Sequence, residues 1–227
     1  MAEAAGKSVE AGLRDGLGVL GLSLTDGQIG QLLGYLDLIA KWTKVYNLTS
    51  VRDPQDMLTH HLLDSLAIIA PLRRHTGGRS ADLLDVGAGA GLPGVVIAIC
   101  CPELEVTCVD TVAKKAAFIQ QVAASLRLPN LRGVHARVES LSGPFDVITS
   151  RAFASLADFA GWSVGALGEG GVWLAMKGKH PADEIAALPP GVQVFHVEQL
   201  AVPGLGAERC VVWMSKQPVA GGVSAGR

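Results

Sequence analysis

The chain has 227 residues, of which 49% are hydrophobic and 18% are charged, and its formal net charge at pH 7 is −2. This balance excludes an intrinsically disordered chain and a polycationic nucleic-acid coat, and it leaves enough apolar residues to bury a substantial core. No apolar run approaches the roughly 18 residues that cross a bilayer, and the N-terminus has no apolar secretion signal, so we expect a cytoplasmic protein that contacts no membrane.

The first third of the chain has the residue spacing of helices. Residues 25–28 (Thr-Asp-Gly-Gln) have the form of a capping box, after which apolar residues recur every three or four positions and predict a helix that ends near Tyr46. The Asp-Pro pair at residues 53–54 predicts the start of a second helix, which continues to Pro71. Residues 73–80, which include two adjacent glycines, are predicted to be a linker.

From residue 81 the pattern changes, because short runs rich in Val, Ile and Leu alternate with helical stretches. Strands are predicted at residues 82–86, 104–109, 131–136, 145–150 and 171–176. Helices are predicted between and after them at residues 93–101, 114–126, 156–167 and 181–188. This alternation is typical of βαβ units in a mostly parallel sheet. Two further strands, at residues 192–200 and 208–215, follow each other directly and predict a C-terminal antiparallel hairpin.

Together these patterns predict an α/β fold with a doubly wound, Rossmann-like sheet that is mostly parallel and closed by the antiparallel hairpin. We expect an N-terminal helical extension over residues 1–80, a ligand-binding domain over residues 81–217 and an unordered tail over residues 218–227. The four cysteines show neither a CxxC pair nor metal-ligand spacing, so we expect buried, reduced thiols and no metal site.

A glycine-rich turn at the end of the first predicted strand carries the strongest functional signal. Gly87, Gly89 and Gly91 let the backbone turn tightly and approach a ligand closely, because no Cβ intervenes. Asp110 ends the second predicted strand, where a carboxylate can accept both hydroxyls of a ribose. The turn therefore predicts a nucleotide-like cofactor, and its spacing alone fits both a dinucleotide and S-adenosylmethionine.

Asp85, two residues before the first glycine, favours S-adenosylmethionine. Its carboxylate would repel a pyrophosphate but attract the ammonium and sulfonium groups of S-adenosylmethionine. The late hairpin also suits a methyltransferase sheet better than a six-stranded dehydrogenase sheet. An NAD-dependent oxidoreductase on a Rossmann fold is the alternative enzyme, and a non-catalytic, ribosome-associated RNA-binding protein is the alternative outside the enzymes.

Several longer runs accompany the glycine turn over most of residues 40–180. The runs are Tyr46-Asn-Leu-Thr-Ser-Val-Arg52, His61-Leu-Leu-Asp-Ser-Leu66, Asp85-Val-Gly-Ala-Gly-Ala-Gly-Leu-Pro-Gly94, Ser150-Arg-Ala-Phe-Ala-Ser-Leu156 and Met176-Lys-Gly178. In content and order they resemble the RsmG (GidB) family of class I methyltransferases, which methylate guanine N7 in bacterial 16S ribosomal RNA. The resemblance implies the class I methyltransferase fold, S-adenosyl-L-methionine as cofactor, and 16S ribosomal RNA of the small ribosomal subunit as partner.

The resemblance also implies roles for single residues. Val138 and Glu139 would hold the adenine, Gly87 and Leu92 would contact the cofactor in the first loop, and Arg151 would contact its methionine end. The full set expected to bind the cofactor is Asp85, Gly87, Gly89, Gly91, Leu92, Asp110, Val138, Glu139 and Arg151. The residues expected to grip RNA phosphates are Lys41, Lys44, Arg52, His60, His61, Arg73, Arg74, Lys177 and Lys179. His60 stands where an arginine is expected, which would make that contact weaker and dependent on pH.

No residue is expected to act as a catalytic acid or base. Guanine N7 carries an exposed lone pair and no proton, so the enzyme has only to align N7 with the methyl group, exclude water and tolerate a base that becomes cationic. The target base must be unstacked, and a single-stranded RNA loop offers it most easily. We expect the protein to act as a monomer.

Overall fold

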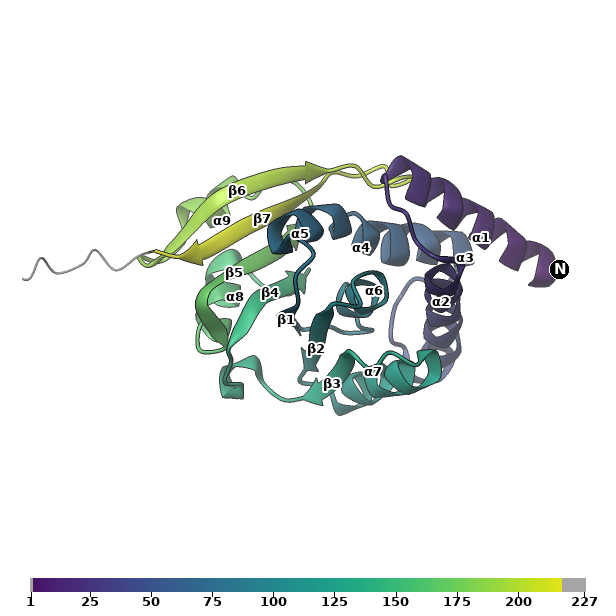
Figure 1. The fold of residues 1–227 in the computed structure, drawn as a ribbon, viewed down its shortest axis with the longest axis horizontal. Helices are drawn as coiled ribbons and strands as arrows, with labels where there is room; N and C mark the ends of the chain where they lie inside the picture. The colour runs from purple at the N-terminus through teal and green to yellow at the C-terminus, as the bar shows by residue number, and fades with distance from the viewer. Residues whose placement is uncertain (1, 218–227) are drawn as a thin grey trace, which may run out of the picture.

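A seven-stranded mixed sheet forms the centre of the protein (Figure 1). The computed structural model describes residues 2–217, with side chains from residue 8 onward, so the predicted tail at 218–227 lies outside the described residues. The strands are β1 (Ala81–Val86), β2 (Leu104–Asp110), β3 (Leu131–His135), β4 (Phe145–Arg151), β5 (Leu167–Lys177), β6 (Val192–Leu200) and β7 (Arg209–Lys216). Their order is β3-β2-β1-β4-β5-β7-β6; β1 to β5 are parallel, and β7 is antiparallel to both neighbours. The predicted Rossmann-like sheet with its closing hairpin is confirmed.

Helices cover both faces of the sheet. The helices that follow the sheet strands are α6 (Gly94–Cys100), α7 (Ala113–Leu126), α8 (Leu156–Ser163) and α9 (Ala182–Ala186). On one face, Phe118 of α7 shares an apolar core with Leu62 of the N-terminal helices. On the other face, Phe159 of α8 lies in a second core. Leu83 and Leu84, consecutive in β1, belong to opposite cores, so the central strand is buried on both faces, as its continuous apolar run predicts.

The N-terminal part of the described chain is entirely helical apart from its connections. The elements are α1 (Ala2–Val19), α2 (Asp26–Tyr46), α3 (Pro54–Met57), the π-helical turn η1 (Leu58–Leu63), α4 (Asp64–Leu66) and α5 (Ile69–Thr76). The predicted capping box forms at the start of α2, where the Thr25 side chain accepts a hydrogen bond from the Gln28 N–H. The predicted Asp53 cap with Pro54 in the first turn also forms, at α3.

Two expectations for this part are wrong. The second helix does not stop at Pro71, because Pro71 lies in the first turn of α5, where a residue without an N–H breaks no helical hydrogen bond. Residues 73–76 consequently belong to α5 and not to a linker. The helix ends at Gly77, which adopts the left-handed conformation with φ 62°.

Helix α2 is fastened to the sheet side of the molecule by side-chain hydrogen bonds. The buried Tyr35 hydroxyl donates to the carbonyl oxygen of Ala90, in the glycine-rich turn, at 2.6 Å. Gln28 Nε2 donates to the carbonyl oxygen of Ile99 in α6 at 2.8 Å. The N-terminal helices therefore help to position the turn. The division into two domains at residue 80 stays a prediction.

The C-terminal half differs from expectation mainly at α8 and β5. Helix α8 ends at Ser163, four residues early, and β5 begins at Leu167, four residues early, where Leu167 pairs with Phe145. The glycines at the start of β5 hide this extension in the sequence. All four cysteines are free and buried, as predicted. Within residues 2–217, no helix has the length and apolar character that a membrane span requires.

Candidate functional site

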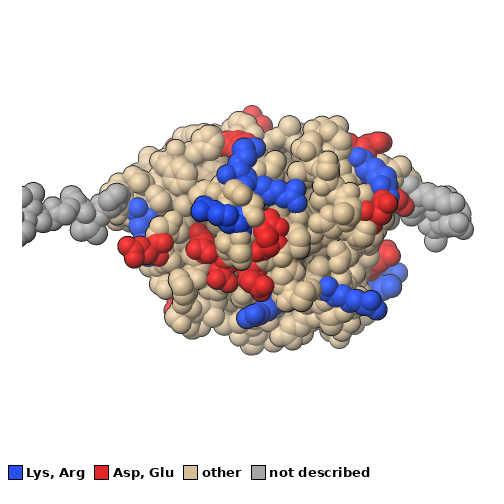
Figure 2. Space-filling model, in the orientation of Figure 1, with Lys and Arg blue, Asp and Glu red and all other residues tan. Residues whose placement is uncertain are grey.

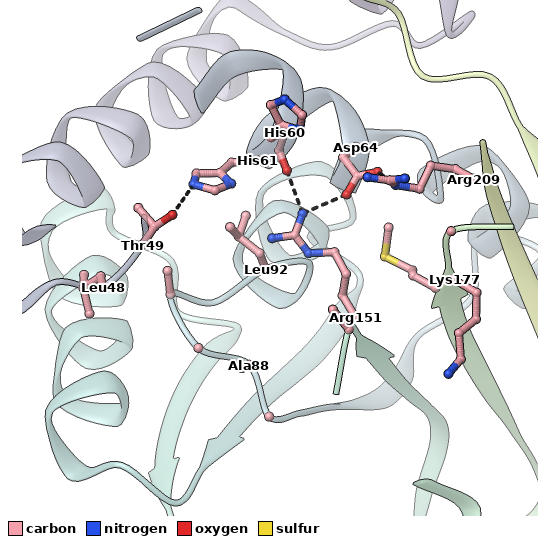
Figure 3. Close-up of a pocket in the computed structure, with 16 residues that line it drawn as sticks. Leu48, Thr49, His60, His61, Asp64, Ala88, Leu92, Arg151, Lys177 and Arg209 are labelled. Atoms are coloured by element: carbon pink, nitrogen blue, oxygen red, sulfur yellow. Dashed lines mark hydrogen bonds and ion pairs between the residues drawn. The ribbon is translucent and has the colours of Figure 1, made fainter. Parts of the chain in front are cut away.

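Two adjoining cavities open at the carboxyl edge of the parallel strands. The first, of about 520 Å³, lies over the turn that follows β1 and is bordered by η1, the end of β5 and Arg209 at the start of β7 (Figure 3). The second, of about 510 Å³, lies beyond the ends of β2, β3 and β4. Gly87 and Ala152 line both. Ligands of open α/β sheets bind at this edge, so the pair of cavities is the candidate site.

The turn after β1 needs its glycines both for conformation and for space. Gly87 and Gly91 have φ angles of 66° and 90°, in the left-handed region. A Cβ on Gly91 would lie 2.4 Å from Val95 Cγ2, and a Cβ on Gly87 would lie 2.1 Å from the ring of Phe153. Any other residue would strain the backbone and collide with a neighbour. The Gly87 N–H donates to the carbonyl oxygen of Val109, which holds the turn against β2.

Asp85 lies behind this turn and lines neither cavity. Its side chain is fully buried, and Oδ2 accepts a hydrogen bond from the Gly94 N–H at 2.8 Å. Oδ1 has no hydrogen-bond partner among the described residues. Burial raises the pKa of the Asp85 carboxyl to about 7, although the hydrogen bond from Gly94 opposes the shift. Asp85 therefore braces the turn against α6 from behind, and its expected contact with the cofactor stays a prediction.

Asp110 stands between the turn and the second cavity. Its Oδ2 accepts from the Gly89 N–H at 3.0 Å, and its Oδ1 accepts from the Val112 N–H at 2.8 Å. A carboxylate has about four acceptor positions, so Asp110 retains capacity for hydroxyl groups of a ligand. Val138 and Glu139 border the same cavity from the 3-10 turn η2 (Val138–Ser140). The structure thus brings together the three residues expected near an adenosine.

Asp64 joins two arginines in the first cavity (Figure 3). Its Oδ2 accepts from Arg151 Nη1 at 2.9 Å, and its Oδ1 accepts from Arg209 Nε at 2.8 Å. Arg151 Nη1 also donates to the carbonyl oxygen of His60 at 2.8 Å. The Asp64 side chain is 5% exposed. One carboxylate between two guanidinium groups leaves a net positive charge, which suits a carboxylate or phosphate of a ligand.

His60 and His61 both line the first cavity, although adjacent residues of an α-helix point in different directions. Both lie in the π-helical turn η1. His60 is exposed, whereas His61 is buried and its Nε2 lies 3.0 Å from Thr49 Oγ1. Burial, together with the positive charge of Arg151, lowers the pKa of His61 to about 4. The His61 imidazole is therefore neutral at pH 7.

Phe153 lines the second cavity, beside the point where the two cavities meet at Gly87. Its ring lies against Gly87 and packs edge-on against Trp162, with ring centroids 5.8 Å apart. Ala152 has a φ of 51°, in the left-handed region, and turns the chain after β4 toward this position. Such a conformation costs an alanine about 1 kcal/mol, so the fold holds the turn in place. The Phe153 ring therefore borders the second cavity close to Gly87, which lines both cavities.

Of the basic residues expected to bind RNA, only His60, His61 and Lys177 line the first cavity. Lys41, Lys44 and Arg52 are exposed on α2 and on the segment after it, which passes the cavity at Thr49. Lys177 borders the cavity, but its Nζ lies 2.7 Å from a carboxylate oxygen of Glu184 and points away from the Asp64 cluster (Figure 3). Lys179 is exposed just beyond β5 and does not line the cavity.

Arg73 and Arg74 lie apart from both cavities, in the last turn of α5. Arg73 donates to the carbonyl oxygen of Cys100, at the end of the sheet where β2 begins. Arg74 Nη2 pairs with Glu198 of β6 at 2.6 Å. Figure 2 shows Lys and Arg side chains grouped over α5, beside a group of acidic side chains. These two arginines cannot act at the same place as Lys41 and Arg52.

The sequence did not single out several residues of the site. Asp64, Thr49 and Phe153 lie inside the runs that carry the family resemblance. The sequence therefore marked the segments that contain them but indicated no role for these three side chains. Arg209 has no local motif and stands 145 residues from Asp64. Among residues 8–217, whose side chains are described, His, Cys, Asp and Glu form no group suited to a metal ion.

Solved structures with a similar fold are methyltransferases. The 1,6-didemethyltoxoflavin-N1-methyltransferase of Burkholderia thailandensis superimposes with a TM-score of 0.56 at 18% identity, over 82% of this chain and 90% of that chain. TrmN from Thermus thermophilus superimposes with a TM-score of 0.54 at 20% identity, over 70% of this chain and 53% of that chain. At these identities the likeness concerns the fold, which is the class I methyltransferase sheet.

Sequence relatives are much closer. A family model described as GidB, rRNA small subunit methyltransferase G, matches residues 28–212. A protein of Polaromonas sp. named ribosomal RNA small subunit methyltransferase G is 69% identical over 94% of this chain and 96% of its own length. A protein of the same name from Acidovorax sp. is 66% identical over 94% of this chain and 97% of its own length. The chain belongs to the rRNA small subunit methyltransferase G (GidB) family.

Proposed function

We propose that this chain transfers a methyl group from S-adenosyl-L-methionine to N7 of a guanine in 16S ribosomal RNA. The observation that carries the proposal is the 69% identity to a ribosomal RNA small subunit methyltransferase G over almost its whole length. The two cavities that meet at Gly87 support the position of the donor. The family relationship disfavours an NAD-dependent oxidoreductase, and the intact turn with Asp110 disfavours a non-catalytic RNA-binding protein.

The donor site follows the strand ends. In the second cavity, Asp110 would accept the ribose hydroxyls, with Val138 and Glu139 beside the adenine. In the first cavity, Arg151 would bind the carboxylate of the methionine end, while Asp64 fixes the direction of its guanidinium group. When bound, the cofactor supplies an electrophilic methyl group on a sulfonium. Along the turn, Gly87, Gly89 and Leu92 line the first cavity and would lie against the cofactor. Gly91, which faces Val95, would shape the turn, and Asp85 would brace it from behind.

The residues of this chain would orient the guanine and the methyl donor, and none of them would transfer a proton. Guanine N7 attacks with a lone pair that carries no proton, so no general base is required. The methylated base is cationic, and a neutral His61 at the cavity wall adds no further positive charge at pH 7. Asp64 offsets one of the two guanidinium charges nearby. The site therefore tolerates the product while its remaining positive charge attracts the RNA backbone.

RNA would approach the rim of the first cavity. Lys41, Lys44 and Arg52 would contact phosphates on one side, and His60 and Lys179 would contact them on the other. We propose that a monomer is the active form. The proposed substrate supports a cytoplasmic enzyme that needs no membrane.

The test is methyl transfer from tritiated S-adenosylmethionine to small ribosomal subunits from a strain that lacks this gene. We expect label in 7-methylguanosine at one nucleotide of 16S RNA. Asp110→Ala should reduce labelling through weaker donor binding, whereas Val164→Ala, an exposed change just after α8, should not. Label on a ribose or on another base atom would contradict the N7 assignment, and absence of label in the RNA would refute the function.

A further inference from the structure

An aromatic hollow lies on the flank of the molecule between α5 and the β6–β7 hairpin, which run side by side in Figure 1. Its volume is about 390 Å³. We call it the flank hollow; the side chains that line it are Pro71, Arg74, His75, Phe195, His196, Glu198 and Trp213. None of them borders the two cavities of the candidate site.

A β-bulge creates the hollow. The pairing of β6 with β7 shifts register between Val194 and His196. Because of the extra residue, the neighbouring side chains Phe195 and His196 both border the hollow instead of pointing to opposite faces. Val194 and Val197 pack against the second core on the other side of the hairpin. The bulge thus directs an aromatic side chain outward, and Phe195 is 50% exposed.

The floor and rim of the hollow have distinct chemistry. Trp213 forms the floor, with the His75 ring at 4.8 Å and the Phe195 ring at 6.3 Å from it, centroid to centroid. On the rim, Arg74 Nη2 donates to both carboxylate oxygens of Glu198, at 2.6 and 2.8 Å. His196 Nε2 lies 3.8 Å from Glu198. An aromatic face beside donors and acceptors held in place is the pattern of a base-binding site.

We propose that the flank hollow binds an unpaired nucleobase of the ribosomal RNA substrate, stacked on Phe195, at a nucleotide other than the methylated one. This inference rests on the proposed function, since it takes RNA as the substrate. Charge supports it, because Figure 2 shows Lys and Arg side chains grouped over α5, and Arg74 of α5 lines the hollow with its guanidinium group held in place by Glu198. An aromatic platform flanked by basic side chains is how proteins bind single-stranded RNA.

The position of the hollow fits one continuous stretch of RNA. Trp213 and Arg209 lie on the same strand, four residues apart, which is about 13 Å at the rise of a β-strand. An RNA loop at the first cavity, which Arg209 borders, can therefore place a neighbouring nucleotide at the hollow. A protein partner is disfavoured, because a stable protein interface takes roughly 800 Å² from each partner, whereas the exposed aromatic surface here is essentially one ring.

Steady-state kinetics with small ribosomal subunits test the stacking role. Phe195→Leu keeps apolar bulk but removes the aromatic face, and we expect it to raise KM for the subunits about fivefold or more while kcat and the affinity for S-adenosylhomocysteine stay unchanged. Phe195→Tyr should restore the wild-type KM. Val164→Ala, an exposed apolar control on the opposite face of the sheet, should have no effect. Equal KM values for wild type and Phe195→Leu would overturn the inference.

Photo-crosslinking identifies the occupant. With a benzoylphenylalanine at position 195 of the full chain, we expect a crosslink to one unpaired nucleotide of 16S RNA, away from the methylated guanine. Crosslinks only to a ribosomal protein or to a second copy of this chain would overturn the inference. If the wild-type protein methylates RNA and Phe195→Leu has the same KM for the subunits, only this inference fails. If the wild-type protein does not methylate RNA, the proposed function itself fails.

Discussion

Two buried side chains near the site, Asp85 and His61, have pKa values shifted in opposite directions. Their effects on the pH dependence of stability oppose each other, so replacing either residue alone should expose the effect of the other. Burial raises the pKa of Asp85 from its ordinary value of 3.8 to about 7. Burial also lowers the pKa of His61 from 6.5 to about 4. The variants Asp85→Asn and His61→Gln should therefore change the pH dependence of the free energy of unfolding, each with its own sign.

The sign follows from the protons bound in each state. Between pH 4 and 6.5, folded Asp85 keeps a proton that the unfolded chain loses, so rising pH lowers the stability by about 1.4 kcal/mol per pH unit. Folded His61 lacks a proton that the unfolded chain binds, so rising pH raises the stability by the same amount. The two contributions cancel in the wild type. From pH 4.5 to 6.5, Asp85→Asn should gain about 2 kcal/mol relative to the wild type, and His61→Gln should lose about 2 kcal/mol, because the unfolded-state groups are partly titrated at the ends of this window.

Urea unfolding followed by circular dichroism at pH 4.5, 5.5 and 6.5 measures both slopes. Subtracting the wild-type curve removes the titrations that all three proteins share. The double variant serves as the control, because it should run parallel to the wild type. If Asp85→Asn and the wild type change in parallel over this window, the folded protein holds Asp85 ionised and the account of the brace behind the glycine turn is wrong.

Further variants test the turn and the arginine cluster. Gly87→Ala places a Cβ 2.1 Å from a phenyl ring at a φ of 66°, so it should cost about 2 kcal/mol or more and weaken S-adenosylhomocysteine binding in calorimetric titration. Gly30→Ala, a helix position where the new Cβ meets nothing within 4 Å, should instead stabilise the protein by about 0.5–1 kcal/mol in thermal unfolding. Asp64→Asn should cost about 2 kcal/mol in urea unfolding, because two charged hydrogen bonds at a buried carboxylate are weakened. Glu184→Gln, with its side chain 35% exposed, should cost less than about 1 kcal/mol, and equal losses in these two variants would contradict the burial argument.

Local chemistry made much of the fold predictable. The parallel strands appear as continuous apolar runs because both faces are buried, and the turn after β1 appears as glycines because left-handed backbone and close neighbours require them. The ends of elements were less predictable. The bounds of helix α1, within the expected helical extension, were not predicted, since its glycines lower helix propensity. Those glycines serve packing: a Cβ on Gly12 would lie 2.9 Å from Leu58, and one on Gly16 would lie 2.5 Å from Leu63.

The candidate site was predictable only where one segment supplies it. The turn and Asp110 follow directly from strand ends, whereas the Asp64 cluster joins residues 87 and 145 positions apart in the chain. No local pattern records such a contact. Asp85 shows a related limit. Its place two residues before Gly87 predicts a carboxylate near the cofactor, but sequence spacing does not show in which direction the side chain points. Here the carboxylate points to the Gly94 N–H, behind the turn.

A crystal structure with S-adenosylhomocysteine would test most directly whether the donor lies across the glycine turn. We predict the adenosine in the second cavity beside Asp110 and Val138, and the homocysteine passing Gly87 and Phe153 toward Arg151. A ligand bound instead in a different crevice, such as the one between α7 and β3 lined by Gln120 and Arg132, with both cavities at the turn empty, would contradict the account.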